Sequence, residues 1–213
     1  MPDLARLTAL ARGLVPAQAA IAAADPGQTY PLLPGEVLPN AVPSRRAEFS
    51  AGRYAARVAM AALGLPLRAI PMGDDRAPIW PAGLVGSISH CRGACLAAVM
   101  PGAAGLGLDL EGDDDLPADL WDSILLPAER DWVQRQTQPG AAAKLIFSAK
   151  EAAYKAQYAQ SRTLFGFYAL QITVSATSFV ASFQREIAPY SAGARLAGRW
   201  ARAEGLVLTI AQG

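Results

Sequence analysis

Two nearly identical pentapeptides, one in each half of the chain, constrain the fold more than any other feature of the sequence. The segments Leu32–Glu36 (LLPGE) and Leu125–Glu129 (LLPAE) share four of five residues. Five residues can match by chance, but each segment also follows an apolar strand-like stretch and precedes a helix with its charged residues on one face. The matching order of elements predicts a duplicated α+β unit.

We therefore expect an α+β fold with a pseudo-twofold duplication, in which two similar lobes each pack a long helix on a small, mostly antiparallel sheet. The Gly- and Ala-rich segment at residues 101–105 predicts the boundary, giving an N-terminal lobe at residues 1–103 and a C-terminal lobe at residues 104–213. A site between two such lobes would receive arginines from the first long helix and acidic and lysine side chains from the second.

Apolar periodicity and breaker residues predict the remaining elements. Helices are expected over residues 3–14, over residues 44–63 with Ser44 as the cap, and from residue 141 onwards. The strands are expected at residues 15–24, 67–72, 84–90, 95–100, 106–111, 170–174, 179–183 and 206–210, with a hairpin turn at Arg92–Gly93.

The helix expected over residues 44–63 has an alanine-rich side and an arginine-rich side. The residues expected to face inward are Ala51, Ala55, Val58 and Ala62. The arginines on or near the other side are Arg45, Arg46, Arg53 and Arg57. They form either a solvated face, which is the commoner case, or a phosphate clamp, because the guanidinium fork matches phosphate oxygens.

The segment Phe147–Lys155 (FSAKEAAYK) falls in the third helix. Ser148, Glu151 and Lys155 are three and four residues apart, so they share one helix face. That face is either a surface ion pair worth about 0.2–0.5 kcal/mol or a reactive site with a hydroxyl, a carboxylate and an ammonium. The side expected to be buried carries Phe147, Tyr154 and Tyr158.

The distribution of lysine favours the reactive site. The chain has 19 basic residues, but its only lysines are Lys144, Lys150 and Lys155, all within twelve residues. An arginine-biased coding sequence explains why lysine is rare but not why it clusters. A compact ammonium binds phosphate as a point charge, so the cluster indicates a phosphate site on this helix.

The strand expected at residues 106–111 has a leucine at every second position, with a glycine and two acidic residues at the other positions. Asp109 and Glu111 share one face and lie about 6.6 Å apart along the strand, which lets both carboxylates reach one cation. The alternative is an exposed strand face that runs into the solvated acidic turn at residues 112–115. Two carboxylates are what Mg²⁺ commonly takes when substrate phosphates and water complete its coordination.

Composition excludes several classes of protein. A net charge of +1 provides no strong field for nucleic acid, and no run of about 18 apolar residues predicts a membrane span. The first residues do not form a basic stretch followed by an apolar one, so we expect no secretory leader. Cys91 and Cys95 are too few for a disulfide scaffold. We therefore expect a cytoplasmic protein with reduced cysteines. These cysteines and His90, the only histidine, match no usual set of zinc ligands.

Several motifs together resemble the 4'-phosphopantetheinyl transferases, in particular their two-lobed, broad-specificity type that includes the enterobactin synthetase component. The resemblance covers roughly residues 30–175 and, more weakly, the C-terminal strands. The combination of Gly-x-Asp-x-Glu with Ser-x-Lys-Glu-x-x-x-Lys some forty residues later is its most specific part. The motifs are Ser44–Arg53 (SRRAEFSAGR), Pro78–Pro81 (PIWP), Gly86–Cys91 (GSISHC), Gly107–Glu111 (GLDLE) and Phe147–Lys155.

The resemblance implies transfer of 4'-phosphopantetheine from coenzyme A to a serine of an apo acyl or peptidyl carrier protein, with release of adenosine 3',5'-bisphosphate. Asp109, Glu111 and Glu151 would hold Mg²⁺, and Glu151 would take the serine proton. Lys155 would neutralise the phosphate under attack, with Lys150 as a possible helper. The C-terminal lobe is then the metal and catalytic side.

The resemblance also implies that the N-terminal lobe would bind the coenzyme A end, chiefly its 3'-phosphate, through Arg45, Arg53, Ser89 and His90. Helix geometry instead places Arg46 on the face of Arg53, so both Arg45 and Arg46 are candidates. Some relatives carry a lysine at the position of Met72, for which Arg76 is a possible substitute.

Two other functions are compatible with the sequence. A non-catalytic coenzyme A or carrier-protein binding module would bind without turnover, but it would not need three acidic groups. A Mg²⁺-dependent enzyme acting on another nucleotide is disfavoured because no Gly-rich phosphate loop occurs. The carrier could serve fatty-acid, polyketide or siderophore synthesis, and a monomer is expected because a duplicated chain already supplies both lobes.

Overall fold

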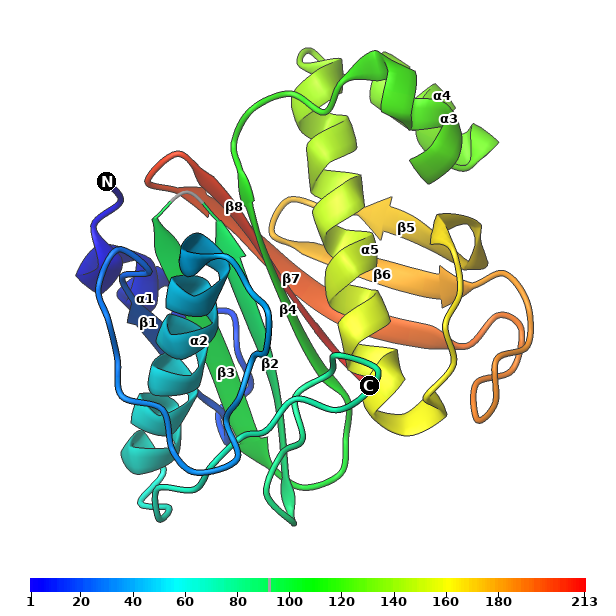
Figure 1. Ribbon diagram of the computed structural model, residues 1–213. Coiled ribbons are helices and arrows are strands. Elements are labelled where there is room, and N and C mark those ends of the chain that lie inside the picture. Colours follow the sequence, from blue (N-terminus) through cyan, green and yellow to red (C-terminus); the bar gives the residue numbers. More distant parts are fainter. Residues whose placement is uncertain (92) are drawn as a thin grey trace. The chain divides into compact units, whose positions relative to one another are not determined.

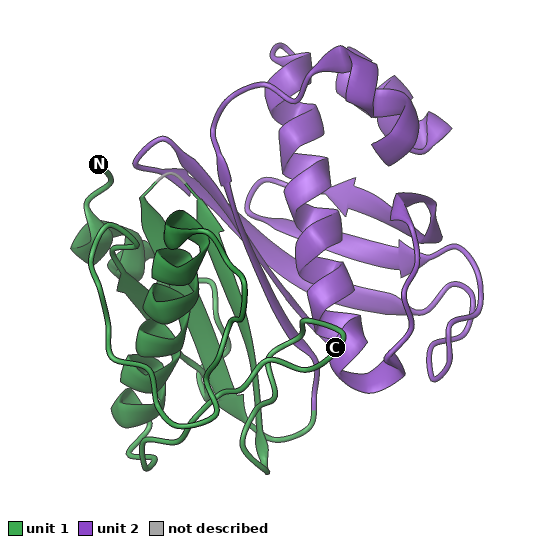
Figure 2. Cartoon of the chain, in the orientation of Figure 1, with its two compact units in different colours: residues 1–103 green, residues 104–213 purple. Residues whose placement is uncertain are grey.

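The computed structural model describes residues 1–91 and 93–213, and it has an α+β architecture (Figure 1). The chain divides into two compact units, unit 1 at Met1–Ala103 and unit 2 at Ala104–Gly213 (Figure 2). Each unit contains one long helix and one antiparallel sheet. The predicted α+β class is therefore confirmed.

Unit 1 packs two helices with a three-stranded antiparallel sheet of order β1-β3-β2. Helix α1 begins after Asp3, whose carboxylate accepts two backbone N–H groups of the first turn, as an N-cap should. The elements are α1 (Leu4–Arg12), β1 (Ala20–Ala24), α2 (Pro43–Ala62), β2 (Leu84–Cys91) and β3 (Ala94–Pro101).

Two local predictions for unit 1 need correction. Helix α2 begins at Pro43, and its N-cap Val42 makes no side-chain hydrogen bond, so Ser44 lies inside the helix and does not cap it. Proline suits this position because its missing N–H has no partner in the first turn. Residues 67–72 form no strand and contribute only an isolated bridge between Met72 and Pro78. Strands β2 and β3 pair as predicted, although Arg92 of the turn lies outside the described residues.

The buried face of α2 is rotated relative to the prediction. Ala51 and Ala55 are buried as expected, but Val58 is 38% exposed whereas Arg53 and Arg57 are buried. Periodicity failed here because it counts every arginine as solvent-facing, and both of these arginines have acceptors inside unit 1.

Unit 2 places the longest helix, α5, against a five-stranded antiparallel sheet of order β4-β8-β7-β6-β5. Strand β7 was not predicted, because arginines and glycine interrupt its apolar pattern. The elements are β4 (Leu106–Gly112), η1 (Ala118–Leu120), α3 (Trp121–Ile124), α4 (Pro127–Gln134), α5 (Pro139–Ser161), η2 (Phe167–Ala169), β5 (Leu170–Val174), β6 (Ser178–Phe183), β7 (Arg195–Ala203) and β8 (Leu206–Gln212).

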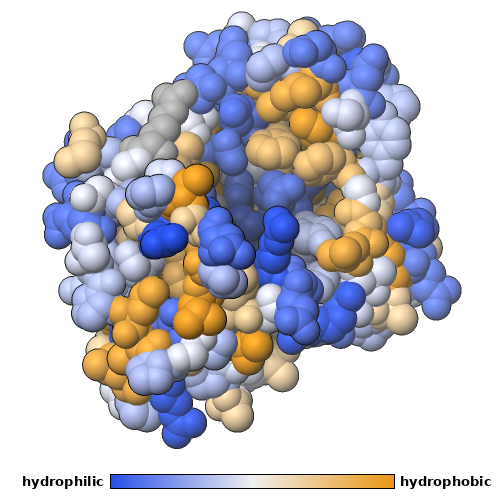
Figure 3. Space-filling view, viewed as in Figure 1, coloured by the Kyte–Doolittle hydropathy of each residue, from blue (hydrophilic) through white to orange (hydrophobic). Residues whose placement is uncertain are grey.

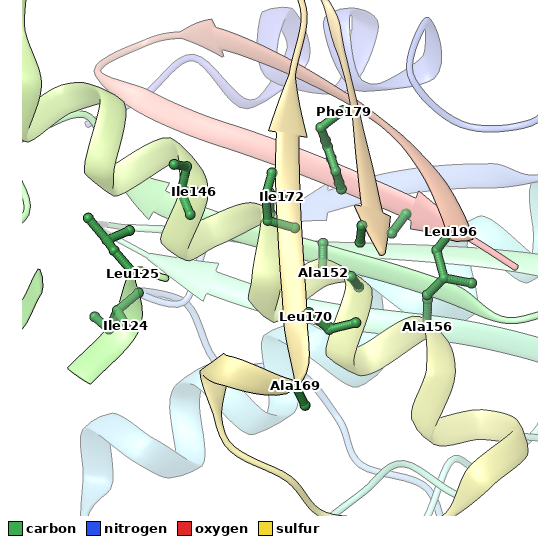
Figure 4. Packing of buried hydrophobic residues seen from close by; sticks show 14 of the residues in the cluster. Ile124, Leu125, Ile146, Ala152, Ala156, Ala169, Leu170, Ile172, Phe179 and Leu196 are labelled. Carbon is green, nitrogen blue, oxygen red and sulfur yellow. The ribbon is translucent and has the colours of Figure 1, made fainter. Parts of the chain in front are cut away.

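The core of unit 2 lies between α5 and the sheet (Figure 4). Small helix residues such as Ala152 and Ala156 face larger sheet residues such as Leu170 and Phe179, all nearly inaccessible to solvent. Phe147, predicted to be on the buried side, is only partly buried at the margin of this core. In the described residues no helix is long and apolar enough to cross a membrane.

Helix α5 lies directly on β4 because two glycines allow the backbones to meet. A Cβ at Gly107 would lie 1.9 Å from the carbonyl oxygen of Ala152, and one at Gly105 would lie 2.2 Å from that of Ala156. The same register continues with Ser148 beside Asp109 and Lys144 beside Glu111. Four helix residues rise about 6 Å and two strand residues about 6.6 Å, so the two elements stay in step.

We expect Gly107→Ala to prevent stable folding of unit 2, because the added methyl group meets backbone atoms that have no alternative position. Gly166→Ala is the matched control, since a Cβ there meets nothing within 4 Å. Circular dichroism and thermal melting of the purified variants measure the effect. A native-like melting temperature for Gly107→Ala would contradict the close approach of α5 to β4.

The glutamate that ends the repeated pentapeptide makes the same set of contacts in each unit. In unit 1, Glu36 accepts the backbone N–H of Leu33 and of Ile70, and its carboxylate contacts the Arg57 guanidinium at 2.6 Å. Arg57 also donates to the carbonyl of Pro31. Glu36 thereby links its own loop to helix α2, through Arg57, and to the loop that contains Ile70.

Unit 2 repeats this arrangement with different residues. Glu129 accepts the N–H of Leu126 and of Ile172, and it contacts the ammonium of Lys150 at 2.7 Å. Lys150 also donates to the carbonyl of Ile124. Arg57 lies 21 residues after Glu36, and Lys150 lies the same number after Glu129. The matching network supports the duplication inferred from the pentapeptides.

Candidate active site

The acidic face of β4 is directed at α5. Leu108 and Leu110 occupy the alternate positions of the strand, so Gly107, Asp109 and Glu111 share the face that α5 covers. Asp109 is 3% exposed. The strand and the helix thus bring the two predicted motifs together within unit 2.

Asp109 is held at both carboxylate oxygens. Its Oδ1 is 2.7 Å from the Nζ of Lys155, which also donates to the carbonyl of Leu108. Its Oδ2 accepts from the hydroxyl of Ser148 at 2.9 Å. The predicted hydroxyl–carboxylate–ammonium face of α5 therefore meets β4 at Asp109.

Glu111 lies beside Lys144, which the sequence indicated only as a member of the lysine cluster. The Nζ of Lys144 is 3.7 Å from Glu111 and 3.9 Å from Asp114. The Lys144 side chain is only 10% exposed, whereas that of Glu111 is 28% exposed. Lys144 therefore places a positive charge behind the more accessible carboxylate.

Burial and mutual repulsion make the acidic cluster unfavourable when it is fully ionised. Burial, with the charges of Asp109 and Glu151 added, raises the pKa of Glu111 against the opposing effect of Lys144 and Lys155. Burial and the Asp109 charge likewise raise the pKa of Glu151, and Lys155 opposes this. Such a cluster gains stability from any added cation.

The donor set fits a small hard cation that substrate oxygens also coordinate. In the described part of the chain, no three His, Cys, Asp or Glu side chains converge into a complete cage. Asp109 and Glu111 nevertheless share one strand face, and Glu151 interacts electrostatically with both. Mg²⁺ commonly takes one or two carboxylates and fills its octahedron with substrate phosphates and water, so a complete protein cage is not required.

An apolar pocket of about 100 Å³ adjoins Glu151. Its walls include Tyr154, Phe165, Phe167 and Leu170, and Figure 3 shows apolar side chains gathered on this part of unit 2, beside α3 and α4. The pocket offers a mainly apolar surface next to Glu151, with Lys150 also in its lining.

The ammonium group of Lys150 makes its contacts inside unit 2. Its side chain is 1% exposed, and it contacts Glu129 and the carbonyls of Ile124 and Phe167. Burial lowers its pKa, although Glu129 opposes that shift. This lysine therefore stabilises the loops around α5, and its ammonium is buried among these groups instead of facing a phosphate.

In unit 1 the structure brings Arg45 and His90 together. The Arg45 Nη1 is 2.6 Å from the His90 Nε2, and Glu48 contacts both side chains, at 3.1 and 3.5 Å. Arg46 instead donates to the carbonyl of Ala41. Of the two candidate arginines, Arg45 is therefore the one beside the histidine. Glu48 was not predicted to be part of this site. Its position three residues after Arg45 on the same helix could have predicted the ion pair between them.

The other two predicted groups of unit 1 are placed differently. Ser89 precedes His90 on β2, so the two side chains project from opposite faces of the strand. Arg53 is buried, donates to the carbonyl of Ile70 and lies over the ring of Phe49 at 3.9 Å. Burial lowers its pKa to about 10. Neither group shares the partly exposed position of Arg45.

Cys95 is a core residue of unit 1 and not part of a metal or nucleophilic site. Cys95 is fully buried, and burial raises its pKa to about 12, which keeps it protonated near neutral pH. Zinc ligands and cysteine nucleophiles act as thiolates, so Cys95 is a core residue.

Comparison with known proteins matches each unit to a family model, and both models describe the same family. Residues 33–100 match the family model described as the 4'-phosphopantetheinyl transferase N-terminal domain, and residues 105–211 match the model of the 4'-phosphopantetheinyl transferase superfamily. A 4'-phosphopantetheinyl transferase of Mycobacterium tuberculosis is 38% identical over 87% of this chain and 87% of its own length.

Two further relatives extend this similarity. A 4'-phosphopantetheinyl transferase of Nocardia iowensis is 37% identical over 81% of this chain and 84% of its own length. Enterobactin synthase component D of Salmonella typhimurium is 35% identical over 78% of this chain and 71% of its own length.

Proposed function

The chain belongs to the 4'-phosphopantetheinyl transferase superfamily and is a transferase of phosphopantetheine from coenzyme A to carrier proteins; we propose that the β4–α5 face of unit 2 is its catalytic centre. The observation that carries this proposal is the meeting of Asp109, Glu111, Glu151 and Lys155 on one side of that strand and helix.

The duplication supports the assignment to unit 2. Arg57 of α2 corresponds to Lys150 of α5, so the next residues, Val58 and Glu151, also correspond. Val58 is apolar and 38% exposed. The equivalent helix of unit 1 therefore lacks the carboxylate, as expected if one unit performs the chemistry.

We assign separate roles to the charged groups. Asp109, Glu111 and Glu151 would hold Mg²⁺, which supplies a Lewis acid that offsets charge developing on the pyrophosphate oxygens. Glu151 accepts the hydroxyl proton as the carrier serine Oγ forms its bond to phosphorus and the bond to adenosine 3',5'-bisphosphate breaks. The Lys155 ammonium neutralises the phosphate under attack. Phosphoryl-type transfer needs this positioning and charge compensation more than covalent help from the protein.

The apolar pocket beside Glu151 suits the uncharged part of the donor. Its aromatic and leucine walls offer apolar contacts next to the carboxylate. We further propose a cytoplasmic monomer that takes acyl or peptidyl carriers, including those of siderophore synthesis, the pathway that the names of the enterobactin synthase relatives suggest. A dimer in light scattering would contradict the monomer.

In unit 1 we propose that Arg45 and His90 bind the 3'-phosphate of coenzyme A. We expect Arg45→Ala to raise the KM for coenzyme A by about 10-fold or more, because a charge-assisted hydrogen bond worth about 1.5–3 kcal/mol is lost, while kcat changes little. Arg46→Ala is the matched control, since Arg46 is bound to the Ala41 carbonyl. An unchanged KM for Arg45→Ala, or equal effects of the two variants, would contradict the assignment.

An intact-mass assay tests the proposed reaction. The protein is mixed with coenzyme A, MgCl₂ and an apo acyl or peptidyl carrier protein, with and without a chelator. We expect the carrier to gain the mass of one phosphopantetheine group, to lose that gain in chelator and to recover it when Mg²⁺ is restored. Binding of coenzyme A with no gain on either carrier would instead favour the binding-module alternative.

A further inference from the structure

A pair of hydroxyl groups lies behind Asp109, on the side away from Lys155. Ser148 of α5 and Thr209 of β8 are both 0% exposed. Thr209 is directly opposite Asp109 in the β4–β8 ladder, so the two side chains lie on the same face of the sheet. Neither hydroxyl has a role in the transfer mechanism described above.

The hydroxyl protons of Thr209 and Ser148 are donated in sequence, from Thr209 to Ser148 and from Ser148 to Asp109. The Ser148 Oγ is 2.9 Å from the Asp109 Oδ2 and 2.9 Å from the Thr209 Oγ1, which is itself 2.9 Å from the Ser148 carbonyl oxygen. An ionised carboxylate only accepts, so the single hydroxyl proton of Ser148 is donated to Asp109. The Thr209 proton is then donated to Ser148, either to its Oγ or to its carbonyl oxygen.

This direction has a consequence for Asp109. The hydrogen bond donated by Ser148 fixes its Oδ2, and Oδ1 is the oxygen that contacts Lys155. Full burial of both hydroxyls means that water does not replace a lost partner. The orientation of Asp109 therefore depends on two residues that touch no reacting atom.

We propose that Ser148 and Thr209 are positioning residues that orient Asp109 for a divalent cation. The inference rests on the proposed function, because it assumes that Asp109 is a cation ligand. It adds Thr209, from the last strand of the chain, to the residues on which the transfer depends. Outer-shell partners of this kind typically change metal affinity or activity by about 10–100-fold when they are removed.

The test measures cation binding without turnover. Wild type, Thr209→Val and Ser148→Ala are titrated with Mn²⁺ in the presence of coenzyme A and without a carrier protein, and free Mn²⁺ is followed by electron paramagnetic resonance. Mn²⁺ is the probe because oxygen sites that suit Mg²⁺ also take it. We expect the Kd to rise about 10–100-fold in both variants and to return towards the wild-type value in Thr209→Ser, which keeps the hydroxyl.

Thr173→Val is the matched control, because Thr173 is exposed on β5 and should leave Mn²⁺ binding unchanged. Thermal melting without metal identifies a variant that does not fold, in which case Ser148→Ala and Thr209→Ser decide the question. Wild-type Mn²⁺ affinity in folded Thr209→Val and Ser148→Ala overturns the inference. A wild-type protein that neither binds Mn²⁺ nor transfers phosphopantetheine overturns the proposed function instead.

Discussion

Replacing Lys150 with methionine is expected to lower the free energy of unfolding by about 3–5 kcal/mol, the usual cost of leaving one partner of a buried ion pair unpaired. Lys150 and Glu129 each have side chains that are 1% exposed. Methionine keeps most of the side-chain volume but leaves the carboxylate without its cation, and it also leaves the carbonyl of Ile124 without its donor. Denaturant titration measures the loss.

The double variant Lys150→Met with Glu129→Gln provides the control. It removes both charges. The side-chain oxygen of the glutamine can still accept one of the two backbone N–H groups, of Leu126 and Ile172, that donate to Glu129 in the wild type. We expect the double variant to be more stable than Lys150→Met alone. Arg57→Met should show a similar loss in unit 1, because Arg57 holds the equivalent position beside Glu36. A loss below about 1 kcal/mol, the range of exposed ion pairs, would contradict the structural role of Lys150.

The Glu151→Gln variant is expected to lose transfer activity by roughly 10²- to 10⁴-fold, the usual contribution of a general base, while its thermal stability increases. Burial and the nearby Asp109 charge raise the pKa of Glu151 in the folded state. Between the unfolded-state pKa and this raised pKa, the folded protein binds more protons than the unfolded chain, so stability falls as pH rises through that interval. Glutamine has no such charge, so the variant avoids this loss.

Thermal melts of the apo protein and intact-mass assays measure both effects on the same preparation. Asp131→Asn is the matched control, because Asp131 is exposed on α4 and lies outside the cluster. We expect that control to match the wild type in activity and melting temperature. Wild-type activity in Glu151→Gln would remove Glu151 from the mechanism, and a lower melting temperature would show that its charge stabilises the fold.

The sequence predicted the fold well where a short pattern is compatible with only one kind of local structure. The LLPxE repeat indicated a duplicated unit because each copy lies in the same order of elements, and the structure shows that both glutamates accept two backbone N–H groups. The alternation from Gly107 to Glu111 predicted β4 because only a strand puts side chains two residues apart on one face.

The errors arose where a partner distant in sequence determines burial. Arg53 and Arg57 were placed on the polar side of α2, but carbonyl and carboxylate acceptors far along the chain allow both to be buried. Lys150 was assigned to phosphate because the distance to Glu129 could not be read from the sequence. Thr209 was missed for the same reason, and Lys144 was counted in the lysine cluster without a role of its own, because the partner of each is an acidic residue of β4.

The most direct test of the catalytic centre is a parallel measurement on Asp109→Asn, which keeps the shape of the side chain and removes its charge. Coenzyme A binding is measured by calorimetry, and holo-carrier formation is measured by intact mass. We predict a folded protein that still binds coenzyme A and forms holo carrier at least about 100-fold more slowly than the wild type, as expected when a group that compensates transition-state charge is removed. Holo-carrier formation at the wild-type rate would contradict the assignment of catalysis to the β4–α5 face.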